Sequence, residues 1–166
     1  MKNIKNNFII AICLYLIDVF ILNQGIIAIF VIFIIIFFLF PRLLFTIFKK
    51  DKMITQERAI ILLIYILMVI GIITSNKLNN KIAFMRAKKI IQACEEYKSK
   101  YQTYPNKLYD LVPEFITKIP VAKLTLQFNK FYYISSNNMH AIYFVSRPPF
   151  GRPIYNLEKG SWGYLD

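Results

Sequence analysis

The sequence predicts a membrane protein of mixed class, in which apolar helices carry an α+β domain. Two observations support this class. Three apolar runs occupy most of the first 74 residues, and hydrophobic residues make up 57% of the 166-residue chain, against about 45–50% in soluble domains. The remainder is more polar, rich in tyrosine and interrupted by prolines. We therefore expect a membrane domain over residues 1–76 and a water-exposed domain over residues 77–166.

The three apolar runs are long enough for helical spans once their flanking residues are counted. A helix rises 1.5 Å per residue and needs about 20 residues to cross the hydrocarbon layer. We expect spans over about residues 7–24, 26–48 and 57–76. The polar break Asn23-Gln24-Gly25 carries no charge and suits a tight hairpin between the first two spans. Pro41 is expected to mark a bend of the second span toward the membrane surface.

Basic residues are distributed unevenly over the connecting segments, and this distribution predicts the orientation. They lie before the first span and between the second and third, whereas the hairpin has none. These residues are Lys2, Lys5, Lys49, Lys50, Lys52 and Arg58. Short loops rich in Lys and Arg stay cytoplasmic. We therefore expect a cytoplasmic N-terminus, three crossings and an extracytoplasmic second domain. That domain has fourteen basic and six acidic residues, but long domains translocate largely regardless of charge. The frequent Ile, Lys and Asn residues suggest a bacterial source and hence the inner membrane.

Asp18 is the one ionisable residue well inside a predicted span. Intramembrane carboxylates are costly and often functional, as proton relays or helix-pairing groups. In the structural interpretation, Asp18 stays protonated or bonds Asn23 or Gln24 and so holds the bundle together. No second charged residue lies at that depth. We therefore favour the structural role and keep Asp18 as the candidate polar site of the membrane domain.

Residues 77–101 show the clearest periodicity of the second domain. Apolar side chains recur there at alternating steps of four and three, which is typical of one face of a helix. This packing stripe comprises Ala83, Ala87, Ile90, Cys94, Tyr97 and Tyr101. Charged side chains occupy the opposite face. We expect one helix to continue from the third span to Tyr101 and to pack its stripe on a sheet.

The rest of the chain predicts turns, a short helix and strands. Pro105 ends the long helix, and the segment up to Pro113 indicates a turn followed by a short helix. Pieces rich in β-branched and aromatic residues then predict strands. They are residues 124–128, 131–135, 141–145, 154–155 and 162–165. Asn137-Asn138 suits a hairpin turn, because Asn tolerates a left-handed φ. The result is a helix on a small antiparallel sheet, an α+β domain.

The end of the long helix carries a resemblance to a known family. The segment Ala93–Pro105 ends in Tyr-Pro and is followed by a short segment that ends in Leu-Val-Pro. From Ala59 to the C-terminus, this layout resembles the type IV pilin and type II secretion pseudopilin family. The resemblance implies a pilin-like domain, in which a long helix lies half in the membrane and half against an antiparallel sheet.

The sequence also departs from that family near its third span. Family members have one transmembrane helix, made after a leader is cut behind a Gly, with Glu five positions into the mature chain. Met53 and Glu57 have that spacing, but Lys52 stands where the Gly belongs, and two further spans precede it. We therefore expect a pilin-like domain on a permanently anchored protein.

No set of residues in the sequence is typical of catalysis. Ser135, Ser136 and His140 lie close together, but hairpin serines form turns far more often than they act as nucleophiles. The acidic residues belong to a helix face and a loop without pairing for acid–base chemistry. Cys13 and Cys94 are predicted to be small buried groups and not a disulfide. With one histidine and no Cys/His cluster, we expect no metal and no other cofactor.

The sequence thus favours a non-enzymatic protein that acts through contacts with membrane lipid and other envelope proteins. Nucleic-acid binding is disfavoured, since anionic headgroups or an acidic partner explain the positive charge with fewer assumptions. One candidate role is that of an accessory or assembly factor of a type IV pilus or type II secretion system. The alternative is a small polytopic immunity protein that blocks a pore-forming toxin by helix–helix contact. A transporter is disfavoured, because paired intramembrane polar residues are lacking.

Overall fold

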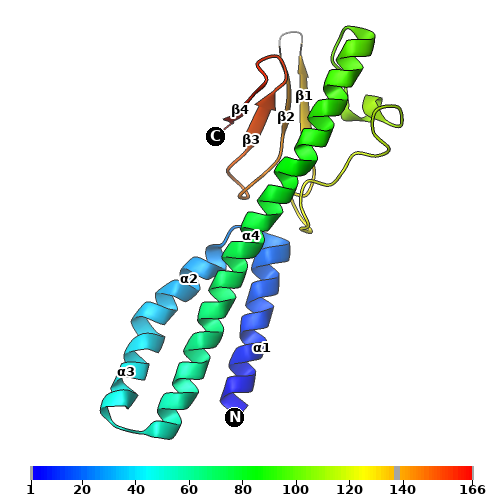
Figure 1. The fold of residues 1–166 in the computed structure, drawn as a ribbon. Coiled ribbons are helices and arrows are strands. Elements are labelled where there is room, and N and C mark those ends of the chain that lie inside the picture. The colour runs from blue at the N-terminus through cyan, green and yellow to red at the C-terminus, as the bar shows by residue number, and fades with distance from the viewer. Residues whose placement is uncertain (1, 137–138, 166) are drawn as a thin grey trace. The chain divides into compact units, whose positions relative to one another are not determined.

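The computed structural model describes residues 2–136 and 139–165 and divides the chain into two compact units. One unit covers Met1–Lys77 and the other Leu78–Asp166. Long apolar helices make up the first unit, and the second contains a small four-stranded antiparallel sheet (Figure 1). The small antiparallel sheet predicted from the sequence is therefore confirmed.

The first unit consists of helical segments with short interruptions. They are α1 (Lys2–Leu16), the π-helix η1 (Ile17–Leu22), α2 (Ile26–Ile34), the π-helix η2 (Ile35–Leu39), α3 (Phe40–Phe48) and the first part of α4 (Lys52–Tyr101). Within the described residues, three helical stretches are long and apolar enough to cross a membrane, by length and composition. They are Lys2–Leu22, Ile26–Phe48 and Lys52–Tyr101.

Pro41 lies at the start of α3, directly after the π-helix η2. A proline has no N–H and its ring clashes with the carbonyl four residues earlier, so a wider π turn before it accommodates the ring. The chain stays helical from there to Phe48. The connection from α3 to α4 is short and covers residues 49–51. Asp51 Oδ1 accepts the backbone N–H of Ile54 at 3.1 Å, which caps α4, so the helix begins at Lys52, upstream of the expected third span.

The second unit combines the rest of α4 with a 3₁₀ turn and the sheet. The elements after α4 are η3 (Leu108–Leu111), β1 (Tyr132–Ser136), β2 (Met139–Tyr143), β3 (Pro153–Asn156) and β4 (Ser161–Tyr164). The strands lie in chain order and every neighbouring pair is antiparallel. The predicted turn at residues 137–138 lies outside the described residues.

The predicted strand over residues 124–128 is wrong. This segment is a loop whose polar groups bond locally: the Thr125 hydroxyl donates to the Gln127 carbonyl at 2.7 Å. The Asn129 amide donates in turn to the Thr125 carbonyl at 2.9 Å. Phe128 has a φ of 52°, a left-handed value that ends any extended run. Local side-chain bonds of this kind compete with a sheet ladder, and here they replace it.

The core of the second unit lies between α4 and one face of the sheet (Figure 1). Ala83, Ala87, Ile90 and Cys94 are fully buried there. The small residues Ala83, Ala87 and Cys94 let the helix approach the strands closely. Phe84, the residue after Ala83 on α4, packs edge-on against two rings of the sheet side. The centroid of its ring lies 5.1 Å from that of Phe144 and 4.9 Å from that of Trp162. Edge-to-face packing of this kind adds to the area buried.

Two positions of the packing stripe lie at the margin of this core. Tyr97 is half-buried and packs against it, whereas Tyr101 is 46% exposed. Tyr101 lies in the last turn of α4, where its ring packs beside Phe115 and its hydroxyl donates to Glu114 at 3.1 Å. The fully buried part of the stripe therefore ends at Cys94, and the two tyrosines cover the edge of the core.

Candidate functional site

An open groove of about 590 Å³ lies in the second unit beside the single histidine. Its walls come from the end of α4, the turn that follows, the paired ends of β1 and β2, and the turn between β3 and β4. The lining residues are Tyr97, Lys98, Gln102, Thr103, Tyr104, Asn106, Ser135, Ser136, His140 and Glu158. All ten carry a polar side-chain group, so the groove can offer many hydrogen bonds to one ligand.

Glu158 is the anionic group of the groove, and the turn between β3 and β4 positions it. Asn156 holds this turn, because its side-chain oxygen accepts the backbone N–H of Lys159 at 2.8 Å and its carbonyl accepts that of Gly160 at 3.0 Å. Gly160 has a φ of +63°, which favours glycine. The turn directs the Glu158 carboxylate toward the start of β2.

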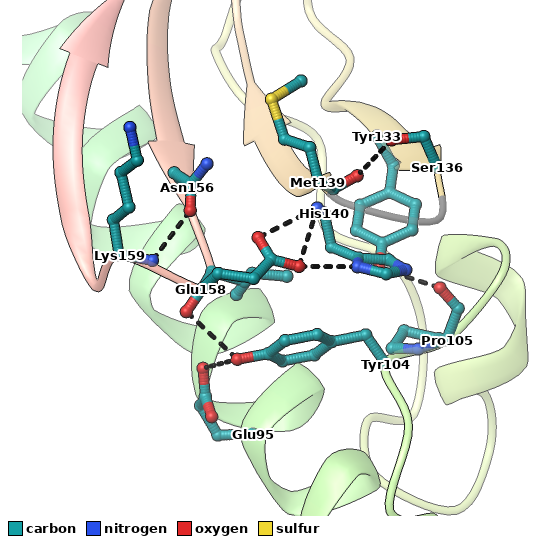
Figure 2. Close-up of polar contacts among 11 residues, drawn as sticks. Glu95, Tyr104, Pro105, Tyr133, Ser136, Met139, His140, Asn156, Glu158 and Lys159 are labelled. Carbon is teal, nitrogen blue, oxygen red and sulfur yellow. Dashed lines mark hydrogen bonds and ion pairs between the residues drawn. The ribbon is translucent and has the colours of Figure 1, made fainter.

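The Glu158 carboxylate binds both the backbone and the ring of His140 (Figure 2). Each of its oxygens lies 3.0 Å from the His140 backbone nitrogen, and Oε1 lies 2.7 Å from ring Nδ1. Partial burial raises the pKa of Glu158, but the hydrogen bonds from His140 outweigh it and hold that pKa below its usual value. Glu158 is therefore ionised at neutral pH and fixes the orientation of the imidazole.

Tyr104 forms the floor of the groove. Tyr104 lies in the turn between the end of α4 at Tyr101 and Pro105. Its side chain is buried against the sheet. Its hydroxyl lies 3.0 Å from Glu95 Oε1 (Figure 2). The same hydroxyl lies 3.0 Å from the Leu157 carbonyl. Burial, and then the neighbouring Glu95 carboxylate, raise the pKa of this hydroxyl, so it remains a donor. The one phenolic hydrogen is shared between the two acceptors.

Cationic and aromatic groups complete the walls around Tyr104. Lys98 Nζ lies 4.4 Å from the centroid of the Tyr104 ring, a distance that permits a cation–π interaction. The His140 ring lies 5.2 Å from the same ring. Tyr133 donates its hydroxyl to the Pro105 carbonyl at 2.8 Å, and burial raises the pKa of that hydroxyl. The buried Tyr104 and the half-buried Tyr133 thus fasten the turn after α4 to the sheet.

The two serines considered from the sequence lie at the rim of the groove. Ser135 pairs with His140 in the β1–β2 register, and Ser136 Oγ donates to the Met139 carbonyl at 3.2 Å (Figure 2). Ring Nδ1 of His140 is engaged by Glu158. Over residues 2–136 and 139–165, no group of three or more His, Cys, Asp or Glu residues could hold a metal ion.

Asp18, the candidate polar site of the first unit, is fully buried. One carboxylate oxygen accepts from the Gly25 backbone N–H at 3.0 Å and from Asn76 Nδ2 at 3.1 Å, and the other accepts from the Ile27 backbone N–H at 3.1 Å. Of the two expected partners, Asn23 bonds Asp18 through the backbone, because its N–H donates to the Asp18 carbonyl at 2.5 Å. Free amides and a positive dipole at the start of α2 attract the carboxylate, and Asp18 joins three segments of the unit.

The two cysteines have different environments, and neither is in a disulfide. Cys94 is fully buried, and burial together with the adjacent Glu95 raises the pKa of its thiol to about 12. Cys13 is exposed on α1, so the prediction that both are buried is wrong for Cys13. Ala11 faces the core of the first unit, and the turn of the helix directs Cys13 away from that core.

Lys123 is a notable residue that sequence reasoning missed. It is only 1% exposed, and its Nζ donates to the Ser146 carbonyl at 2.6 Å. Burial lowers the pKa of Lys123 to about 7. The stretch Val121–Leu126 offers no signal that this lysine points inward. The pairings of Glu158 with His140 and of Tyr104 with Leu157 were missed as well, because they join residues far apart in the chain.

Comparisons with known proteins return no match: no family model, no curated protein and no solved structure matches this chain. The residues and contacts described above are therefore what bear on its function.

Proposed function

We propose that the chain is a membrane-anchored protein whose exported domain acts by contacts with other envelope proteins. Its role in this proposal is that of a non-enzymatic accessory or assembly factor of a type IV pilus or type II secretion system. The observation that carries the proposal is α4. This 50-residue helix is apolar in its first half, and its second half packs small buried residues on a four-stranded antiparallel sheet. The sequence resemblance implies the same division of one helix.

The anchoring part of the proposal rests on hydropathy and on the basic residues of the connecting segments. Three helical stretches have mean hydropathies of 1.8, 2.9 and 2.5 over their most apolar windows. Large side chains such as those of Phe30 and Phe37 are exposed along them, as lipid-facing residues would be. The basic residues at the start of α1 and those of residues 49–58 would remain cytoplasmic. The second unit would then lie outside the cytoplasm.

The contact surface we assign to the partner is the groove beside His140. It combines aromatic rings with fixed polar groups, a composition that is typical of recognition surfaces. Glu158, whose pKa is lowered by its hydrogen bonds from His140, supplies a negative charge, and Lys98 supplies a positive one. The unbonded donors and acceptors of an extended partner segment could pair with Gln102 and Asn106, which are both exposed at the rim. The bound group is therefore expected to be a peptide segment of another envelope protein.

Photo-crosslinking in the native host tests this function. A photoreactive residue at Gln102 in the groove is compared with one at Lys88, which is exposed on α4 outside the groove. Adducts at 102 but not at 88 that contain a pilin, pseudopilin or secretion subunit would support the proposal. An adduct with a pore-forming toxin would support the immunity protein instead. A reporter fused after residue 166 that is active in the cytoplasm would refute the exported location.

A further inference from the structure

Two loops of the second unit expose large apolar side chains to solvent. The first covers residues 121–129 and exposes Val121, Leu124 and Leu126, the last to 74%. The second follows β2 and exposes Phe150 to 70%. A soluble surface rarely gathers such side chains without a binding partner.

Lys123 ties the two loops together. Its buried amine donates to the Ser146 carbonyl at 2.6 Å, and Ser146 in turn donates from its backbone N–H to the Gly151 carbonyl at 2.7 Å. The base of the first loop is closed by the Ala122 N–H, which donates to the Asn129 carbonyl at 2.6 Å. The polar part of each loop therefore points inward, and the leucines and the phenylalanine are left on the outside.

Two side chains of α4 hold the first loop against the beginning of the helix's second half. Asn79 Oδ1 accepts the Leu124 backbone N–H at 3.3 Å, and Arg86 donates to the Val121 carbonyl at 2.9 Å. Asn79 follows Thr74, the last residue of the third apolar run, by only five positions. The exposed leucines thus lie beside the part of α4 that directly follows its apolar half.

Charge is strongly segregated along this unit. Residues 77–94 of α4, residues 115–136 and residues 139–157 contain basic but no acidic side chains. The basic residues include Lys77, Lys81, Arg86, Lys118, Lys130 and Arg147. The acidic residues of the described part of the unit are Glu95, Glu96, Asp110, Glu114 and Glu158. Glu95 lies sixteen positions after Asn79, or ~24 Å along the helix at 1.5 Å per residue. The apolar loops therefore occupy the basic end of the unit.

We propose that this basic end is a lipid-binding surface: Leu124, Leu126 and Phe150 enter the headgroup layer of the leaflet from which α4 emerges, and the neighbouring lysines and arginines bind anionic phospholipid headgroups. Apolar tips beside basic side chains are the composition of interfacial membrane anchors, and each basic residue near an anionic surface adds to the attraction. This inference rests on the proposed membrane anchoring by α4, and it adds a second contact between the same protein and the bilayer.

Depth-dependent fluorescence quenching of the full-length protein in lipid nanodiscs tests whether the proposed surface enters the headgroup layer. Cys13, which is exposed, is replaced by Ser in every variant, whereas buried Cys94 is retained because its raised thiol pKa of about 12 makes it unreactive. A single cysteine at Leu126 then carries an environment-sensitive fluorophore. Tyr109→Cys is the matched control, since Tyr109 is 79% exposed on η3. A third variant, Leu67→Cys, reports on the apolar half of α4.

The proposal expects the label at 126 to be quenched by a shallow spin-labelled lipid several-fold more than the label at 109. Aqueous iodide is expected to give the opposite order. Both differences are expected to be larger in nanodiscs with phosphatidylglycerol than in pure phosphatidylcholine, and to shrink in high salt.

If the label at 67 is quenched by lipid but the label at 126 behaves like the label at 109 in both lipids, the surface proposal is wrong and the membrane anchor stands. If the label at 67 is also quenched by iodide and not by the spin-labelled lipid, the membrane anchoring itself is wrong. A groove adduct with an envelope protein would leave either outcome unchanged, so the two proposals fail separately.

Discussion

Ala87→Asp is the sharpest test of the packing between α4 and the sheet. Ala87 is fully buried in the core of the second unit, together with Ile90, Phe144 and other apolar residues. A carboxylate at this position would enter an apolar core without a cationic partner. An uncompensated buried charge destabilises a protein by about 3–5 kcal/mol. Domains are stable by about 5–15 kcal/mol, and each 1.4 kcal/mol is about a factor of ten. The unfolded fraction is thus expected to rise ~10²–10⁴-fold.

Pulse proteolysis of the full-length protein in detergent or nanodiscs measures this change. The matched control is Lys88→Asp, which introduces the same side chain one residue further along, at an exposed position. Surface substitutions of this kind usually change stability by less than about 0.5 kcal/mol. We expect cleavage of the C-terminal unit of Ala87→Asp at denaturant concentrations at which Lys88→Asp is still protected. Equal protection of the two variants would mean that Ala87 does not face a packed sheet.

Three further substitutions test individual contacts. Tyr104→Phe removes the hydroxyl that bonds Glu95 and Leu157 and is expected to destabilise the second unit by about 1–2 kcal/mol. The control Tyr109→Phe is expected to leave the stability unchanged. Equal denaturation midpoints of the two variants would contradict the two hydrogen bonds assigned to Tyr104. Burial holds the pKa of Lys123 near 7 in the folded protein, against about 10.4 unfolded. The unfolded state therefore binds the extra proton between these values, and stability rises with pH from about 7 to about 10, by up to ~1.4 kcal/mol per unit. Lys123→Met is expected to flatten that slope in denaturation series at stepped pH, and an unchanged slope would exclude Lys123 as its source. Asp18→Asn is expected to leave the protein folded with a lower thermal midpoint, since one amide oxygen replaces two carboxylate acceptors; a midpoint equal to that of the wild type would show that these bonds add no stability.

The sequence predicts a helix or strand well where neighbouring residues in the chain determine that structure. The helical face of α4 follows from the steps of four and three, and Ala83 and Ala87 lie on its buried side. The pieces that match β1 to β4 share β-branched and aromatic residues. The same composition misleads at residues 124–128, because Thr125 and Asn129 bond the loop to itself. A composition rule does not register such side-chain bonds.

The groove could not be predicted from the sequence, because its contacts join residues far apart in the chain. Tyr104 and Leu157 are 53 positions apart, and His140 and Glu158 are 18 apart. A window of a dozen residues carries no information on such pairs. His140 could have been noticed as the only histidine, but nothing nearby identifies Glu158 as its partner. Likewise, a lysine is normally expected to have a solvated side chain, and only the fold buries Lys123.

The distribution of charge also removes a difficulty in the proposed orientation. An exported domain with a net charge of +8 runs against a simple charge count, in which basic segments stay cytoplasmic. The segments over residues 77–94, 115–136 and 139–157 carry basic residues only, whereas the acidic residues lie toward the groove end. In the proposed orientation, the basic end faces anionic headgroups and the groove faces away from the bilayer. In that orientation, the basic residues would bind headgroups of the leaflet from which α4 emerges. Neutralising Lys81 and Lys118 together is accordingly expected to weaken lipid contact at position 126 while the orientation stays unchanged, as read by the reporter fused after residue 166. An inverted orientation in that variant would show that these lysines act on topology.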